Sequence, residues 1–158
     1  MLIRKAAESD KDNLIKKLEE FDNYLNSLFS EEIRPFTFYK NKIDLFNKVV
    51  SDWIANPKYM LFIAEENSEL IGHICGSINT NNVRIKDKEG IVEEWFVSEK
   101  YRGNGVGKKL YETLLDEFKK ANCTHVSLKV FKDNKKAIDL YNKMGFKEFE
   151  LTMIKSLA

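Results

Sequence analysis

The chain has 158 residues, of which 43% are hydrophobic and 32% are charged, and its formal net charge is +1. This is the size of one domain, and the composition is typical of a compact protein rather than a disordered one. A net charge this close to zero gives no global attraction to nucleic acid or to an anionic membrane, so neither is an expected partner.

No stretch is long and apolar enough to span a bilayer, and the first residues lack the apolar core of a signal peptide. The two cysteines, Cys75 and Cys123, are far apart in the sequence, and neither has a partner at metal-ligand spacing. We therefore expect one cytoplasmic domain over residues 1–158, with reduced thiols and no metal.

The first part of the chain predicts a short strand over residues 1–6 and two amphipathic helices. An apolar stripe predicts the first helix, from a cap at Ser9 to about Phe29, and a second stripe predicts a helix over residues 43–55. Pro35 places a loop between them. Neither helix carries a recognisable catalytic motif.

A hairpin follows. Residues 59–64 form a nearly continuous apolar run, as in a strand covered on both faces, and residues 69–80 pair back on it. His73 and Cys75 share one side of the second arm by alternation. Residues two apart on one strand rarely have the geometry of a catalytic pair, so a structural role is favoured for both.

The most informative stretch begins with the apolar, β-branched run 91–97, which predicts a buried strand. A glycine-rich turn with Gly103, Gly105 and Gly107 follows, and apolar residues then recur at helical spacing. Because a helix N-terminus has free N–H groups and a partial positive charge, this turn predicts an anion site. The glycine spacing fits neither a Rossmann fingerprint nor a Walker loop.

The chain continues with an alternating strand over residues 124–131 and then a helix that begins at Asp133 or Asn134 and ends at Gly145. Residues 146–154 predict one or two last strands. The strand–helix–strand unit should have a right-handed crossover and parallel strands. The whole pattern predicts a single mixed α/β domain.

Two separated motifs resemble the GNAT superfamily of N-acetyltransferases. The first is Arg102-x-x-Gly105-x-Gly107, after a strand that ends in Phe96-Val97, and the second is Asn134-x-x-Ala137-x-x-x-Tyr141-x-x-x-Gly145-Phe146. The resemblance implies a twisted mixed sheet of about six or seven strands, with about four helices on both faces. It also implies that the fourth and fifth strands, which are parallel, splay apart to admit the pantetheine arm of acetyl-CoA.

The resemblance also implies the site residues. The backbone of the strand end would bind pantetheine, and the glycine loop would cradle the pyrophosphate. In the later motif, Asn134 would lie near the cofactor and the Tyr141 hydroxyl near the thioester sulfur. The expected cofactor-binding residues are Phe96, Val97, Ser98, Arg102, Gly103, Asn104, Gly105, Val106, Gly107, Lys108, Asn134 and Tyr141.

Amine acetylation needs a base for the amine and a proton for the leaving thiolate. Similar enzymes often use a glutamate on the strand beside the cofactor, so Glu93 is the candidate base and Tyr141 the candidate acid. By alternation Glu94 should face the opposite side, and it is the alternative base. Structural interpretations remain open: an ion-pair role for Glu93, core packing for Tyr141 and a helix cap for Asn134.

The acceptor is less well defined by the sequence. The wall expected to hold the acceptor combines acidic and aromatic side chains, which suit a cationic amine such as a polyamine, an aminoglycoside or a lysine side chain. A primary amine of a small molecule is the expected acceptor. The wall residues are Tyr24, Glu31, Glu32, Phe36 and Tyr39. A protein N-terminus or a lysine side chain is the first alternative, and a non-catalytic acyl-CoA-binding module is the second. No cysteine is placed to carry the acyl group, so direct transfer is expected. A homodimer is possible.

Overall fold

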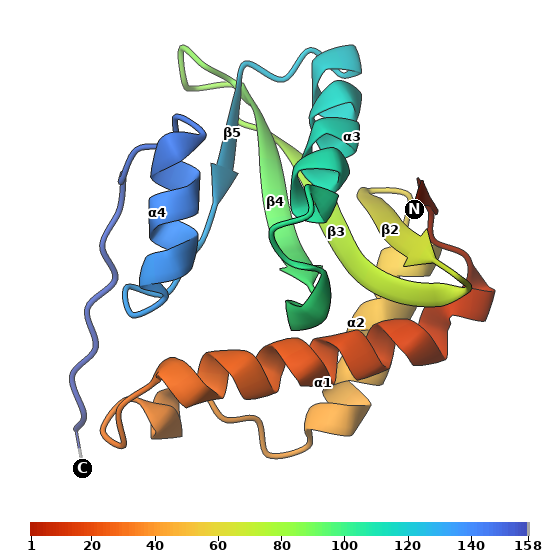
Figure 1. Ribbon diagram of the computed structural model, residues 1–158. Helices are drawn as coiled ribbons and strands as arrows, with labels where there is room; N and C mark the ends of the chain where they lie inside the picture. Colours follow the sequence, from red (N-terminus) through yellow and green to blue (C-terminus); the bar gives the residue numbers. More distant parts are fainter. Residues whose placement is uncertain (158) are drawn as a thin grey trace.

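The computed structural model describes residues 1–157, and its centre is one five-stranded sheet in the order β1-β2-β3-β4-β5 (Figure 1). The strands span, in chain order, Leu2–Lys5, Tyr59–Glu66, Glu69–Thr80, Lys88–Val97 and His125–Leu128. The first three pairings are antiparallel, and β4 and β5 are parallel. The expected mixed sheet and the expected parallel strands near Val92 and Val126 are therefore confirmed.

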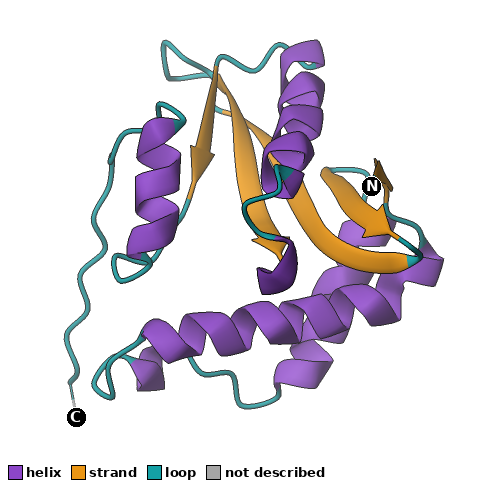
Figure 2. Cartoon of the chain, in the orientation of Figure 1, coloured by secondary structure: helices purple, strands orange, loops and turns teal. Residues whose placement is uncertain are grey.

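Helices cover both faces of the sheet, as expected (Figure 2). The helices are α1 (Lys11–Leu28), α2 (Lys42–Ala55), α3 (Val106–Lys120) and α4 (Lys135–Lys143), and 3-10 turns span Glu8–Asp10, Arg34–Phe36 and Glu99–Tyr101. Leu14 of α1 and Val50 of α2 pack with Cys75 in one core cluster. Leu114 of α3 packs with Ile74 in a second cluster on the other face.

Two glycines allow α3 to pack closely on the sheet. A Cβ atom on Gly90 would lie 2.6 Å from the Phe118 ring, and one on Gly76 would lie 2.8 Å from it. Any larger residue would push α3 outward, because real Cβ atoms do not approach other heavy atoms this closely. At its other end α3 begins beside the last residues of β4, with Gly107 against Trp95.

The parallel strands separate as the resemblance implied. Their ladder runs from Glu89↔His125 to Val92↔Leu128, whereas β4 continues to Val97 and, within residues 1–157, pairs there only with β3. Helix α1 runs across this end of the sheet (Figure 1). Its Phe21 ring lies 5.3 Å from that of Phe96, and Phe29, just after α1, lies 4.7 Å from Phe131, which follows β5.

The C-terminal residues depart from the prediction. The expected strand over residues 146–154 is absent from the described chain, and β5 ends at Leu128 instead of continuing to Phe131. A segment whose apolar residues alternate with a period of two forms a strand only where the edge of another strand is available for pairing. In the structure the segment after α4, which we call the tail (residues 146–157), runs on the far side of α4 from β5 (Figure 1).

The start of α1 also differs slightly from the prediction. Ser9 lies in the preceding 3-10 turn, and Asp10 is the N-cap. The Asp10 carboxylate accepts two hydrogen bonds from Arg4, at 2.7 and 2.8 Å, and one from the Ala7 N–H. This network ties β1 to the start of α1. None of the helices in residues 1–157 is long and apolar enough to cross a membrane.

Candidate active site

A β-bulge in β4 determines where the two candidate bases point. In the register with β3, Cys75 pairs with Glu94 but Gly76 pairs with Val92, so Glu93 is an extra residue. The bulge resets the alternation, and the side chains of both glutamates lie over the same face. The expectation that Glu94 faces the opposite side is therefore wrong, because simple alternation does not hold across a bulge.

Glu93 lies where β4 and β5 part, one residue beyond the last pair of their ladder. Its carboxylate accepts a hydrogen bond of 2.5 Å from the hydroxyl of Ser77, a buried residue of β3. Glu93 itself is exposed to solvent. It is thus a fixed carboxylate with open access, and this is the arrangement that a general base requires.

Glu94 has a different partner. Its Oε1 lies 3.2 Å from Nε2 of His73, whose side chain is fully buried between Trp53 and Phe96. A carboxylate can only accept, so the Nε2–H of His73 donates. Nδ1 has no hydrogen-bond partner in the described chain. The Glu94 carboxylate therefore pairs with a buried histidine, and no pattern in the sequence indicates this pair.

Tyr141 approaches β4 from the α3 face. Its ring stacks on Trp95 at 5.8 Å between centroids and meets Phe146 edge-on at 5.9 Å. Burial, with a smaller contribution from nearby Tyr24, raises the pKa of the Tyr141 hydroxyl above its ordinary value. The phenol therefore stays protonated across the physiological range, so it is able to donate a proton.

Tyr24 of α1 reaches across the separated strands to the other side of the site. Its hydroxyl donates to Oδ1 of Asn134 at 3.3 Å, and the same oxygen accepts from the Ala137 N–H. Asn134 is buried and is the N-cap of α4, so the cap interpretation is confirmed. The Arg102 guanidinium lies over the Tyr24 ring, 4.7 Å from its centroid.

The end of β4 already has several internal contacts. Arg102 Nε donates to the Val97 carbonyl at 2.8 Å. The Ser98 N–H donates to the Ile71 carbonyl, and the Ser98 carbonyl accepts from the Tyr101 N–H. The buried Ser98 hydroxyl accepts a hydrogen bond from Lys17 Nζ and donates one to the Glu20 carboxylate, and both of these residues belong to α1. A ligand on this strand end would therefore meet mainly the backbone of the two residues before Ser98.

The glycine loop fits an anion. Gly103 and Gly105 have positive φ angles of 81° and 78°, and a Cβ on either would meet nothing within 4 Å. The backbone conformation, rather than packing, therefore calls for glycine. Gly105 is the N-cap of α3, and no described side chain caps this end. The first N–H groups of α3 remain free, with Lys108 in the same turn, and this combination suits a diphosphate.

Two other features named from the sequence are the thiol of Cys75 and the expected acceptor wall. Cys75 is fully buried, and burial, together with the nearby Glu93 and Glu94, raises the pKa of its thiol far above the ordinary value, so a thiolate nucleophile is not available there. Phe36 and Tyr39 of the expected acceptor wall are about half exposed.

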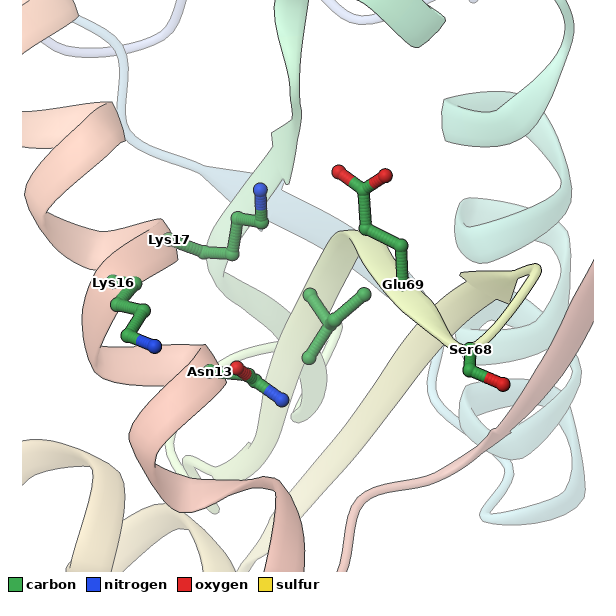
Figure 3. A pocket seen from close by; sticks show the side chains of 6 residues that line it. Asn13, Lys16, Lys17, Ser68 and Glu69 are labelled. Carbon is green, nitrogen blue, oxygen red and sulfur yellow. The ribbon is translucent and has the colours of Figure 1, made fainter.

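A separate shallow pocket lies between α1 and the β2–β3 turn (Figure 3). Lys17 of α1 and Glu69 of β3 line it from opposite sides. The lining residues include neither candidate base nor Tyr141.

Comparison with known proteins agrees with this geometry. Residues 25–146 match the model of the acetyltransferase (GNAT) family. The chain is 29% identical over 155 residues to an N-alpha-acetyltransferase from Sulfurisphaera tokodaii, covering 94% of this chain and 81% of the relative. It is 25% identical over 158 residues to thialysine N-epsilon-acetyltransferase from Sus scrofa, covering 94% and 85%.

A solved aminoglycoside N-acetyltransferase in complex with CoA superposes with a TM-score of 0.76 at 16% identity, covering 98% of this chain and 93% of that one. The family match spans most of the chain, including both motifs, the bulged strand and the glycine loop. The chain therefore belongs to the acetyltransferase (GNAT) family and is an N-acetyltransferase.

Proposed function

We propose that this enzyme transfers the acetyl group of acetyl-CoA directly to a primary amine of a small molecule, with Glu93 as the base and Tyr141 as the acid. The observation that carries this proposal is the split between β4 and β5. Glu93 lies at its apex, on the face covered by α1 and α2, and Tyr141 lies on Trp95, on the face covered by α3. Donor and acceptor would approach from opposite faces and meet in the split.

The chain offers a binding surface for the pyrophosphate and another for the pantetheine arm of acetyl-CoA. The free N–H groups of Val106, Gly107 and Lys108 would bind the pyrophosphate at the start of α3. The β5-facing edge of β4 at Phe96 and Val97 would bind the pantetheine arm, in the manner of an added strand. Acetyl-CoA supplies the activated acetyl group as a thioester.

Two proton transfers fall to the protein. Glu93, held by Ser77, would take one proton from the ammonium before attack, directly or through one water, and release it to solvent, so that the nitrogen lone pair can form the new C–N bond. The second proton that the nitrogen loses as the intermediate collapses would balance the proton given to the leaving sulfur. Tyr141 would donate its hydroxyl proton to the sulfur as the C–S bond breaks. The buried Cys75, with its raised thiol pKa, gives no covalent alternative, and this supports a ternary complex with direct attack.

The face of the sheet covered by α1 and α2, where the acceptor would bind, carries several carboxylates, and this supports a cationic amine as the acceptor. Burial raises the pKa of the Cys75 thiol most, the nearby charges of Glu93, Glu94 and Asp52 raise it further, and Lys58 lowers it. A protonated amine would be attracted to this face before Glu93 deprotonates it. The aminoglycoside enzyme and the thialysine enzyme are both named for small amine acceptors.

A protein N-terminus is the second candidate acceptor, because the relative from Sulfurisphaera tokodaii is an N-alpha-acetyltransferase. The test is to measure free CoA thiol with acetyl-CoA and a panel of acceptors that includes polyamines, aminoglycosides, lysine analogues and peptides with free or blocked N-termini. Release with small amines and not with peptides supports the proposal. Release only with unblocked peptides would replace it with N-terminal acetylation.

A further inference from the structure

A lysine lies beside the carboxylates of the acceptor face. Lys58 comes just before β2 and is exposed, and its Nζ lies 4.5 Å from the centroid of the Tyr59 ring. No carboxylate of residues 1–157 lies within ion-pair distance of this ammonium. The side chain of Tyr59 raises the pKa of the Lys58 ammonium most, and the charges of Asp52 and Glu93 raise it further, so the group stays protonated. Lys58 is therefore a permanent cation that has no counterion in the described part of the chain.

The strand register relates this cation to the candidate base. Tyr59 of β2 pairs with Ser77 of β3, and the Ser77 hydroxyl donates to Glu93 of β4. Tyr59 also packs against the core cluster beneath α1 and α2, so its ring lies on the acceptor face. Because neighbouring strands are about 4.8 Å apart, the backbones of Tyr59 and Glu93, two strands apart, are separated by about 10 Å. One small molecule is long enough to reach both.

Asp52 adds a carboxylate near the cation. It is exposed in the last turn of α2, and its Oδ1 accepts a hydrogen bond of 3.2 Å from the side-chain amide of Asn56. Its charge acts on the Lys58 ammonium, yet the two groups form no ion pair. A carboxylate and an ammonium that are close together and not paired with each other match the head group of an α-amino acid, which carries the two opposite charges on one carbon.

We propose that the acceptor is an amino acid with a primary amine at the end of its side chain. Its carboxylate would bind Lys58 and its α-ammonium would bind Asp52, while the amine to be acetylated meets Glu93. This inference rests on the proposed function. In lysine, six bonds join the side-chain nitrogen to the carboxylate carbon and span roughly 7–8 Å when extended. This length fits the separation of the two strands, because the protein side chains cover the remainder.

A polyamine is a poorer acceptor for this face. Its second cation would meet the Lys58 ammonium at the position where an amino acid places its carboxylate, and like charges repel. Lys58 would therefore select the acceptor in two ways, by attracting a carboxylate and by repelling a second cation.

The test compares kcat/KM for three matched acceptors, measured on the full-length protein as the release of free CoA thiol. Lysine carries both charges of the head group, ε-aminocaproate lacks the α-ammonium, and cadaverine lacks the carboxylate. The wild type should prefer lysine and ε-aminocaproate to cadaverine by about 10-fold or more, the usual effect of a charge-assisted hydrogen bond. Lys58→Met keeps an unbranched side chain but removes the charge, so it should abolish this preference without lowering the value for cadaverine.

Two more variants complete the test. Asp52→Asn should lower kcat/KM for lysine and leave that for ε-aminocaproate unchanged, because only lysine has the α-ammonium. Lys48→Met is the matched control: Lys48 is exposed on α2, and its substitution should preserve all three values.

Equal kcat/KM for lysine and cadaverine in the wild type would overturn this inference and leave the proposed function standing. An equal loss on all three acceptors in Lys58→Met would also overturn it, because it would show a structural role for Lys58. No thiol release with any small amine would instead refute the proposed function, and this inference with it.

Discussion

Substitution of the two glutamates at the bulge should separate a catalytic carboxylate from a structural one. Glu93→Gln keeps an oxygen that accepts from Ser77 but removes the base. Because Glu93 is exposed, the free energy of unfolding should change by no more than about 0.5 kcal/mol. The rate of acetyl transfer should fall on the order of 10²–10⁴-fold, the usual contribution of a positioned base.

Glu94 should show the opposite pattern. Glu94→Ala removes the acceptor of His73 Nε2–H, and this side chain is fully buried with Nδ1 already unpartnered in the described residues. An unsatisfied buried donor costs about 1–3 kcal/mol. For a chain of this length each kcal/mol corresponds to roughly 2–4 °C in Tm, so the expected loss is about 2–12 °C. Glu94→Gln retains an acceptor for His73 and should recover most of this stability.

The assay pairs thermal unfolding with acetyl-transfer rates over a range of pH. The loss in Glu93→Gln should be largest at low pH, where the amine arrives protonated and a base is needed, and smaller where it arrives free. Glu94→Gln, as the control, should show the pH–rate profile of the wild type. If Glu94→Gln loses the rate and Glu93→Gln does not, the base assignment is wrong. If neither changes the profile, neither glutamate is the base.

Three further predictions concern other parts of the molecule. Tyr141→Phe removes the proton donor but keeps the ring packing, so kcat should fall by roughly 10²-fold or more with little change in Tm. Normal turnover in this variant would make Tyr141 only a packing residue. Gly105→Glu should abolish the stabilisation by acetyl-CoA in a thermal-shift assay. Gly105→Asn should largely retain it, because asparagine tolerates positive φ and adds no charge. Equal binding by both variants would place the pyrophosphate elsewhere. The Arg4 guanidinium lowers the pKa of Asp10, so this pair stabilises the fold above the unfolded pKa of about 3.9 and the effect is lost as pH falls through the lower, folded pKa. Asp10→Asn should therefore cost about 1–2 kcal/mol at neutral pH and less in acid, and a difference from wild type that does not depend on pH would contradict the role of the ion pair.

Much of the molecule follows from local sequence. The apolar run, the glycines and the helical periodicity that follows are contiguous, so their order already defines a strand, a turn and a helix with free N–H groups at its start. The spacing from Asn134 to Phe146 likewise predicts α4, its N-cap and the position of Tyr141 on it. These features depend on neighbours along the chain, and the structure confirms the elements.

Pairing between distant segments determined the rest. A bulge is a property of two strands in register, so nothing in the order of Glu93 and Glu94 reveals that both face α1 and α2. Tyr24 meets Asn134 only because α1 crosses the separated strands. The tail carries a strand pattern, yet a strand forms only against an available edge, and α4 separates the tail from the edge of its own sheet. Residue order therefore specifies which elements form, and contacts between distant elements specify which side chains meet.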